Sequence, residues 1–177
     1  KPDGLVTGVQ TCALPIFVKA ITMENVITPF SSLLQQDERL IGELFEVRIL
    51  LETEIARTAA KRLKPESAKL IEDALTQMAQ EIDQGVLGLG GDNMFHTALA
   101  KVADNQALCQ ILDLCSDLIS SSREAGLKKL KDQSISLAHH RKIYQAVLEG
   151  DGELAATLMK HHLEFASKLA SDESAGK

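Results

Sequence analysis

The spacing of aliphatic residues is the feature that most restricts the fold of this chain. Between residues 44 and 82 apolar side chains recur every three or four positions, and no convincing segment of the chain alternates apolar with polar residues. A period near 3.6 places such side chains on one face of an α-helix, whereas a half-buried strand needs a period of two. The sequence therefore predicts helices that pack on one another, without a sheet.

Glycine, proline and polar breaks divide this pattern into separate helices. Pro65 falls in the first turn of one helix, where its missing N–H is not needed, and the glycine-rich residues 85–91 form a hinge. The expected helices cover roughly residues 44–63, 65–85, 92–103, 108–130, 134–148 and 152–169. The predicted fold is an all-α antiparallel bundle of six or seven helices.

Composition restricts the class of protein further. The 177 residues, 45% hydrophobic but without tryptophan, suit one domain with an aliphatic core. A net charge of -6 argues against this chain binding a nucleic-acid backbone by itself. Three cysteines without a CxxC pair fit a reducing compartment, so a cytoplasmic location with no membrane partner is expected.

The two ends of the chain are expected to lie outside the folded domain. Residues 6–16 look like the conceptual translation of a sequencing-library adapter, so residues 1–16 are interpreted as non-native and excluded from the fold. Residues 17–36 are expected to form a linker, residues 37–170 the helical ligand-binding domain, and residues 171–177 a disordered tail.

Asp92 and the five histidines are the residues best suited to chemistry. Asp92 and His96 lie four positions apart, on one face of a short helix. The other histidines form two doublets, in which the apolar neighbours predict that His140 and His162 point inward and that His161 is exposed. Any one buried histidine is more often a hydrogen-bonded core residue than a ligand. Three imidazoles and a carboxylate together suit zinc, or alternatively nickel or manganese.

Several segments together also resemble the FCD domain, the C-terminal effector-binding domain of FadR-subfamily GntR-type bacterial transcription regulators. The resemblance spans about residues 17–170, and it rests on residues 43–52, Asp92-x-x-Phe95-His96 with Asn105, His140-Arg141-x-Ile143 with Gly150-Asp151, and Met159-x-x-His162-Leu163.

The resemblance implies that a divalent metal binds Asp92, His96, His140 and His162, that a small carboxylate effector docks on the metal, and that the chain forms a homodimer. Phe17-Val18 resembles the end of the family's winged-helix domain, so DNA would be reached only through a missing N-terminal domain.

Candidate effector-binding residues follow mainly from the same resemblance. Arg48 matches an arginine that often faces the effector pocket in this family, although an ordinary i,i+4 pair with Glu52 explains it equally well. Arg123, Ser121 and Asn105 are weaker candidates, based on inward-leaning helical positions and on the family.

The function that this resemblance implies is a ligand-sensing, dimerising domain of a transcription regulator, with an effector of the lactate and pyruvate class. The alternative is a metal-dependent helical-bundle enzyme. The chain has no HExxH motif, no paired Glu-x-x-His motifs and no free carboxylate expected beside a ligand, so no catalytic residue is predicted. A helical interaction module without metal would require the histidines to be dispersed.

Overall fold

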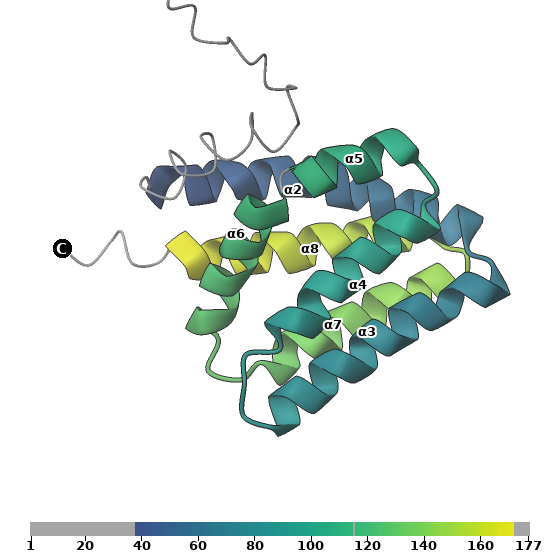
Figure 1. Ribbon diagram of the computed structural model, residues 1–177. Helices are drawn as coiled ribbons and strands as arrows, with labels where there is room; N and C mark the ends of the chain where they lie inside the picture. The colour runs from purple at the N-terminus through teal and green to yellow at the C-terminus, as the bar shows by residue number, and fades with distance from the viewer. Residues whose placement is uncertain (1–37, 115, 172–177) are drawn as a thin grey trace, which may run out of the picture.

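The computed structural model describes residues 38–114 and 116–171. Every regular element in these residues is an α-helix, which confirms the predicted fold class (Figure 1). The predictions for residues 1–16, for residues 17–36 and for the tail beyond Ser171 lie outside the described residues. The seven helices are α2 (Glu38–Arg62), α3 (Pro65–Asp83), α4 (Leu89–Val102), α5 (Gln106–Leu114), α6 (Ser116–Lys129), α7 (Ser134–Leu148) and α8 (Gly152–Ser171).

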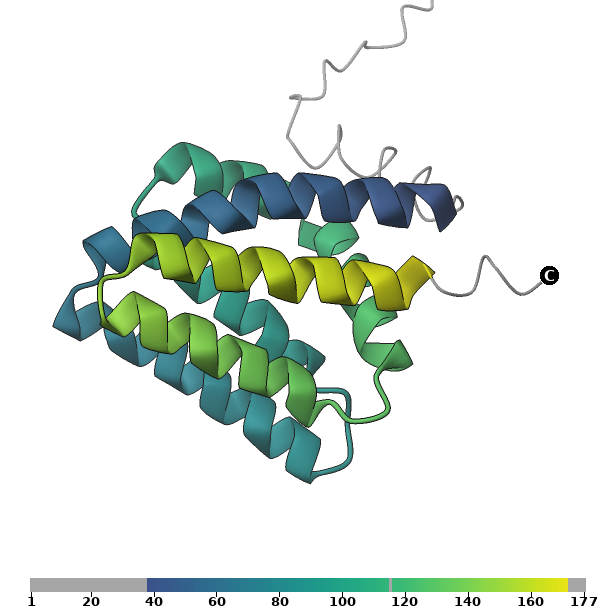
Figure 2. The same ribbon diagram turned by 180° about the vertical axis from the view of Figure 1, so that it is seen from behind.

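The helices form an antiparallel bundle in which distant parts of the sequence meet. Helices α2 and α8 lie side by side, with α7 next to α8 (Figure 2), and α3 packs along α4 and α7. Helix α6 crosses one end of the bundle and contacts α2, α4 and α8. No helix in the described part of the chain is both long and apolar enough to cross a membrane.

The core is mainly aliphatic, as the composition predicts. The buried residues of each helix are those that recur every three or four positions, because these face the neighbouring helices. The buried aromatic exceptions are Phe45, Phe95 and Tyr144, and Phe95 in α4 is fully buried. The largest aliphatic side chains that are at most 1% exposed in the core cluster are Ile55, Ile71, Met78, Leu99, Ile143, Met159 and Leu163.

Helix α2 begins earlier than predicted, and α4 begins at Leu89, inside the glycine-rich segment expected as a hinge, but the largest difference is an additional break. The single helix expected at residues 108–130 is two helices, α5 and α6, which run in different directions (Figure 1). Leu112 and Ile119 lie seven positions apart, a separation that also fits one continuous helix. The apolar spacing therefore could not reveal the change of direction between them.

Two glycines set the position of α4 against α3. Gly88 precedes α4 with a φ of 77°, a left-handed conformation that L-residues with a side chain rarely adopt. At Gly91 the α3 backbone approaches so closely that an added Cβ would meet the Met78 backbone nitrogen at 2.2 Å. The Gly91 N–H donates to Glu81 of α3. These contacts fix the start of α4, which carries Asp92.

Candidate metal centre

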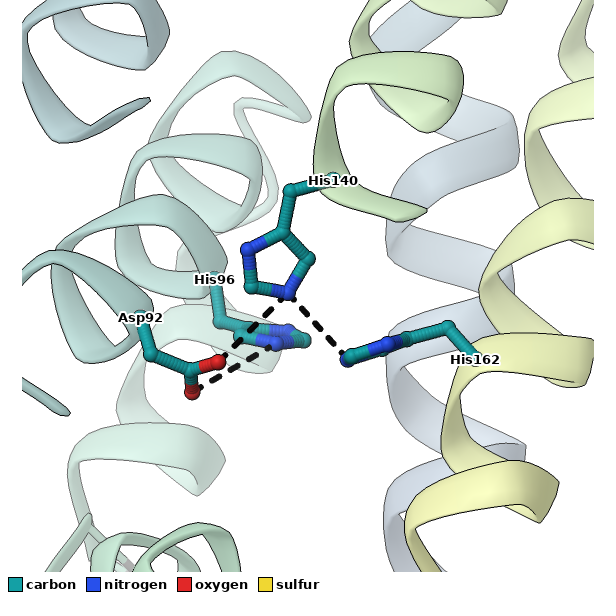
Figure 3. A group of neighbouring side chains, drawn as sticks. All are labelled: Asp92, His96, His140 and His162. Carbon is teal, nitrogen blue, oxygen red and sulfur yellow. Dashed lines mark hydrogen bonds and ion pairs between the residues drawn. The ribbon is translucent and has the colours of Figure 1, made fainter. Parts of the chain in front are cut away.

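Four side chains from three helices converge inside the bundle. Asp92 and His96 come from α4, His140 from α7 and His162 from α8 (Figure 3). Each offers one ligand atom, and these atoms lie within 4.8 Å of one another. All four residues are at most 5% exposed. The structure therefore brings together the four residues that were predicted as metal ligands.

The distances within this group suit a shared ion. The Nε2 atoms of His140 and His162 are 3.2 Å apart, and the Asp92 Oδ1 atom is 3.5 Å from His140 Nε2. Two nitrogen ligands on a tetrahedral zinc ion, each at about 2.0–2.1 Å, lie about 3.3 Å apart. The spacing of the two imidazoles thus matches ligands of one metal ion.

Unpaired polar atoms at the centre of the group point to the same conclusion. Asp92 Oδ2 and His96 Nε2 lie 3.9 Å apart, and neither has a hydrogen-bond partner among the described residues. Leaving buried polar atoms unpaired is unfavourable, because they lose their hydrogen bonds to water. A divalent cation between them would provide the missing interaction, so the residues present fit a metal ion.

The protonation of the histidines also favours coordination. Burial lowers the pKa of His140 and of His162 well below the usual value, and it lowers the pKa of His96 as well. At neutral pH these rings are therefore held in the uncharged form, which is the form that donates a lone pair to a metal. The group could hold zinc, nickel or manganese on chemical grounds.

The remaining two histidines lie outside the group. His161 is exposed, as its polar neighbours predict. His139 is half-buried, and its ring lies edge-on to the rings of His162 and Phe165, with centroids 5.7 and 5.3 Å apart. Each doublet thus contributes one residue to the site, although His139 is packed against a predicted ligand.

Glu52 connects the group to two buried arginines. Its Oε1 accepts from Arg48 Nε at 2.7 Å, and its Oε2 accepts from Arg123 Nη2 at 3.3 Å and contacts His96 Nδ1. Burial raises the pKa of Glu52, but the contact with His96 and the positive charges of Arg48 and Arg123 outweigh this effect and hold the pKa well below its usual value. Glu52 is therefore an ionised carboxylate inside the bundle.

Arg48 pairs with Glu52 and also lines a pocket. Arg48 does pair with Glu52, but the pair is buried, with only 1% and 2% of the side chains exposed. Arg48 also lines a pocket together with Asp92, Arg123 and His162. Its Nη1 donates to Ser122 Oγ at 3.2 Å.

This pocket is where a small molecule could reach the group. Its cavity volume in this arrangement is about 20 Å³, enough for about one water molecule, and its other wall is largely apolar, with Leu127 and Phe165 among the lining residues. A second pocket, with a cavity volume of about 80 Å³, lies on another side of Arg123 and His96. Arg123 also contacts Asp92 through Nε, 3.6 Å from Oδ2, and donates to Asn93 Oδ1 at 2.9 Å.

Two of the weaker sequence candidates lie elsewhere. Ser121 is exposed, and its neighbour Ser122 is the buried serine of α6. An error of one position changes the helix face by about 100°, and the polar composition of α6 made its inner face hard to assign. Asn105 accepts from the Leu108 N–H at 3.2 Å and so caps the start of α5. Neither Ser121 nor Asn105 lines the two pockets next to the group.

The sequence analysis also missed three polar residues around the site, namely Glu52, Asn93 and Ser122. It expected no free carboxylate beside a ligand, but Glu52 does lie against His96. Both oxygens of Glu52 are already engaged by Arg48, Arg123 and His96, so this carboxylate is not available as a general base. The i,i+4 spacing of Arg48 and Glu52 was the available signal.

Comparisons with known proteins agree with this architecture. Residues 43–165 match the FCD domain family. Over 152 residues the chain is 31% identical to the HTH-type transcriptional regulator LutR of Bacillus subtilis, covering 83% of this chain and 69% of LutR. It is also 31% identical over 124 residues to the galactonate operon transcriptional repressor of Escherichia coli, covering 67% of this chain and 52% of the repressor.

A solved structure supports the same assignment. The Streptococcus agalactiae GntR structure superposes with a TM-score of 0.64 and 29% identity, covering 73% of this chain and 59% of that one. The chain thus spans between about half and two thirds of the length of these relatives. The relatives are transcription regulators and not enzymes. From the match of residues 43–165 and the identity with LutR, we conclude that the chain belongs to the FCD domain family of GntR-type transcription regulators.

Proposed function

We propose that this chain is the effector-sensing domain of a transcription regulator and that it binds a divalent metal ion, zinc in the first place, through Asp92, His96, His140 and His162. The observation that carries the proposal is the convergence of these four buried ligand atoms within 4.8 Å. With these four ligands in place, water or an exogenous ligand would bind by expanding the coordination of the metal beyond four positions.

We further propose that the ligand is a small hydroxy- or keto-carboxylate of the lactate and pyruvate class. The small pocket beside the group is lined by Arg48 and Arg123 together with Asp92 and His162. A guanidinium can bind one carboxylate through two parallel hydrogen bonds while a second oxygen of the acid reaches the metal. The name of the galactonate operon repressor, a relative, is consistent with a hydroxy-acid class.

Charge balance predicts that this ligand needs the metal. Arg48 and Arg123 carry two buried positive charges, and Glu52 and Asp92 carry two buried negative charges, so the four sum to zero. A carboxylate that entered a metal-free pocket would lose hydration without meeting a net positive charge. A divalent cation supplies that charge, and the acid should therefore bind much more tightly to the metal-loaded form.

The experiment combines metal analysis with thermal unfolding. We expect elemental analysis to find about one metal ion per chain after exposure to zinc and dialysis. Lactate, pyruvate and galactonate are then screened with and without metal, and the best acid should raise the melting temperature of the loaded form through RT ln(1 + [L]/Kd). Arg48→Ala should weaken this effect and leave the metal bound.

Arg57→Ala is the matched control, because Arg57 lies on the same helix but pairs with Glu54 and Glu153, away from the pocket. It should leave the response to the acid unchanged. Less than about 0.1 equivalent of bound metal would refute the metal site. An equal response to the best acid with and without metal would refute the docking mode.

Dimerisation and DNA recognition are further parts of the proposal. We place DNA recognition outside residues 38–171, in a helix-turn-helix domain of the kind for which LutR is named. We also propose that the chain forms a homodimer, which sedimentation equilibrium would test directly.

A further inference from the structure

Glu52 lies where the metal group and the effector pocket meet. Its side chain is only 2% exposed, and it comes from α2, a helix that contributes none of the four proposed metal ligands. Its carboxylate contacts a proposed ligand, His96, and the two arginines of the pocket. Asp92 also has three partners here, namely His96, His140 and Arg123, but Glu52 is the one that contacts both arginines of the pocket.

The two nitrogens of His96 face different partners. Nδ1 is in contact with Glu52 Oε2, and Nε2 faces Asp92 Oδ2 at 3.9 Å, toward the centre of the group (Figure 3). Among the described residues, no carboxylate contacts the outer nitrogens of His140 and His162, their Nδ1 atoms. Within the described structure His96 is thus the proposed ligand whose outer nitrogen faces a carboxylate.

A neutral imidazole carries its proton on one nitrogen and a lone pair on the other. A carboxylate accepts hydrogen bonds but cannot donate them when ionised, so it selects the tautomer with the proton on the nitrogen that faces it. The lone pair then points away from the carboxylate. In metalloproteins such outer carboxylates also make the imidazole a better electron donor.

We propose that Glu52 is a positioning residue for the metal site: it accepts the Nδ1–H of His96 and so directs the Nε2 lone pair of His96 toward the metal. This inference rests on the proposed function, because it concerns the same site. The inference adds Glu52, which is not one of the four proposed ligands and lies on a different helix, and it assigns a tautomer to His96.

The same carboxylate also links metal binding to the effector side. Arg48 donates to Glu52 Oε1 at 2.7 Å, and Arg123 donates to Oε2 at 3.3 Å. These bonds hold both guanidinium groups at the edge of the pocket that Asp92 and His162 line. Loss of the Glu52 charge should therefore disturb the His96 tautomer and the placement of both arginines.

The direct test uses wild-type protein without metal. Two-bond nitrogen–proton spectra of ¹⁵N-labelled histidine distinguish the Nδ1–H and Nε2–H tautomers of a neutral ring, and His96→Gln assigns the signal. We expect His96 to be the Nδ1–H tautomer. An Nε2–H tautomer would overturn the proposal, whether or not the protein binds metal.

The second test measures metal affinity by competition with a chromophoric chelator. Glu52→Gln keeps the size of the side chain and removes its charge, and we expect zinc to bind at least about tenfold more weakly, within the 10–100-fold range usual for such outer partners. Glu54→Gln is the matched control on the same helix, since Glu54 is exposed and pairs with Arg57. It should change the affinity less than about twofold.

A double-variant cycle separates positioning from a general effect on the fold. His96→Ala removes a proposed ligand and should itself bind zinc only weakly, and in that background Glu52→Gln should have almost no further effect on the residual affinity, because the residue through which Glu52 acts is absent. An equal loss in both backgrounds, or an unchanged affinity in the single variant, would overturn the proposal. If wild-type protein binds no zinc at all, the proposed function fails, and the tautomer measurement still decides the role of Glu52.

Discussion

Replacing Gly91 with alanine should unfold the junction on which the metal group depends. The added Cβ would meet the backbone nitrogen, Cα and Cβ of Met78 at 2.2, 2.3 and 2.4 Å, whereas ordinary contacts begin near 3.4 Å. Backbone atoms in the middle of α3 cannot rotate away, so α3 and α4 must separate by about 1 Å. Overpacking of this kind destabilises by about 1–3 kcal/mol, and a backbone clash belongs at or above the upper end.

The expected loss is thus about 3 kcal/mol of unfolding free energy, which for a chain of this size corresponds to a melting temperature lower by about 6–12 °C. Calorimetry of metal-free protein measures it. Gly90→Ala is the matched control, because its Cβ would meet the flexible Glu81 side chain and should shift stability by less than about 1 kcal/mol. Gly91→Ala that melts within 2 °C of wild type would refute the argument that the helix contact at Gly91 is rigid.

Two further predictions concern the histidines. His140→Ala and His162→Ala should each abolish tight zinc binding, because each removes a ligand atom. His161→Ala should leave the zinc affinity unchanged, and His139→Ala should reduce it only slightly, through lost packing on the His162 ring. Calorimetric titration with zinc compares the four variants, and equal losses within either doublet would contradict the assignment of helix faces. Burial lowers the pKa of His96, His140 and His162, so in metal-free protein the unfolded chain, whose histidines titrate near about 6.5, takes up protons first as the pH falls. The stability contributed by these rings is therefore complete above about pH 6.5 and declines below it, by up to about 1.4 kcal/mol per pH unit for each histidine, and metal occupancy should fall below about pH 6. Urea unfolding at pH 7.5 and 5.5 checks the sign, and greater stability at pH 5.5 would be the opposite of what the buried rings require.

The four proposed ligands could be predicted from the sequence, because successive residues of a helix point in directions that differ by about 100°. Within each doublet only one histidine can share the face of the apolar stripe. Ile143 and Val147 predict that face for His140, and Met159 with Leu163 flank His162 on the buried side of α8. The strong apolar stripes of α7 and α8 thus made the assignment reliable.

The residues around the proposed ligands were harder to predict from the sequence, for two physical reasons. Helix α6 carries three consecutive serines, so its composition does not distinguish the buried Ser122 from the exposed Ser121. The role of Glu52 depends on which helix faces α2 across the core, and periodicity within α2 contains no such information. A charged i,i+4 pair on a helix is usually solvent-exposed, and only the packing of α4 and α6 over α2 buries this one.

A bound effector can shift a regulator between two arrangements only if it binds one of them better. Under the proposed function, the groups that would hold the acid and its metal come from five helices: Arg48 and Glu52 from α2, the ligands from α4, α7 and α8, and Arg123 from α6. This set of contacts is complete only when all five helices have the arrangement seen here. The binding free energy of metal and acid is therefore available to hold that arrangement, and α2 is the helix through which it would reach the residues that precede the domain.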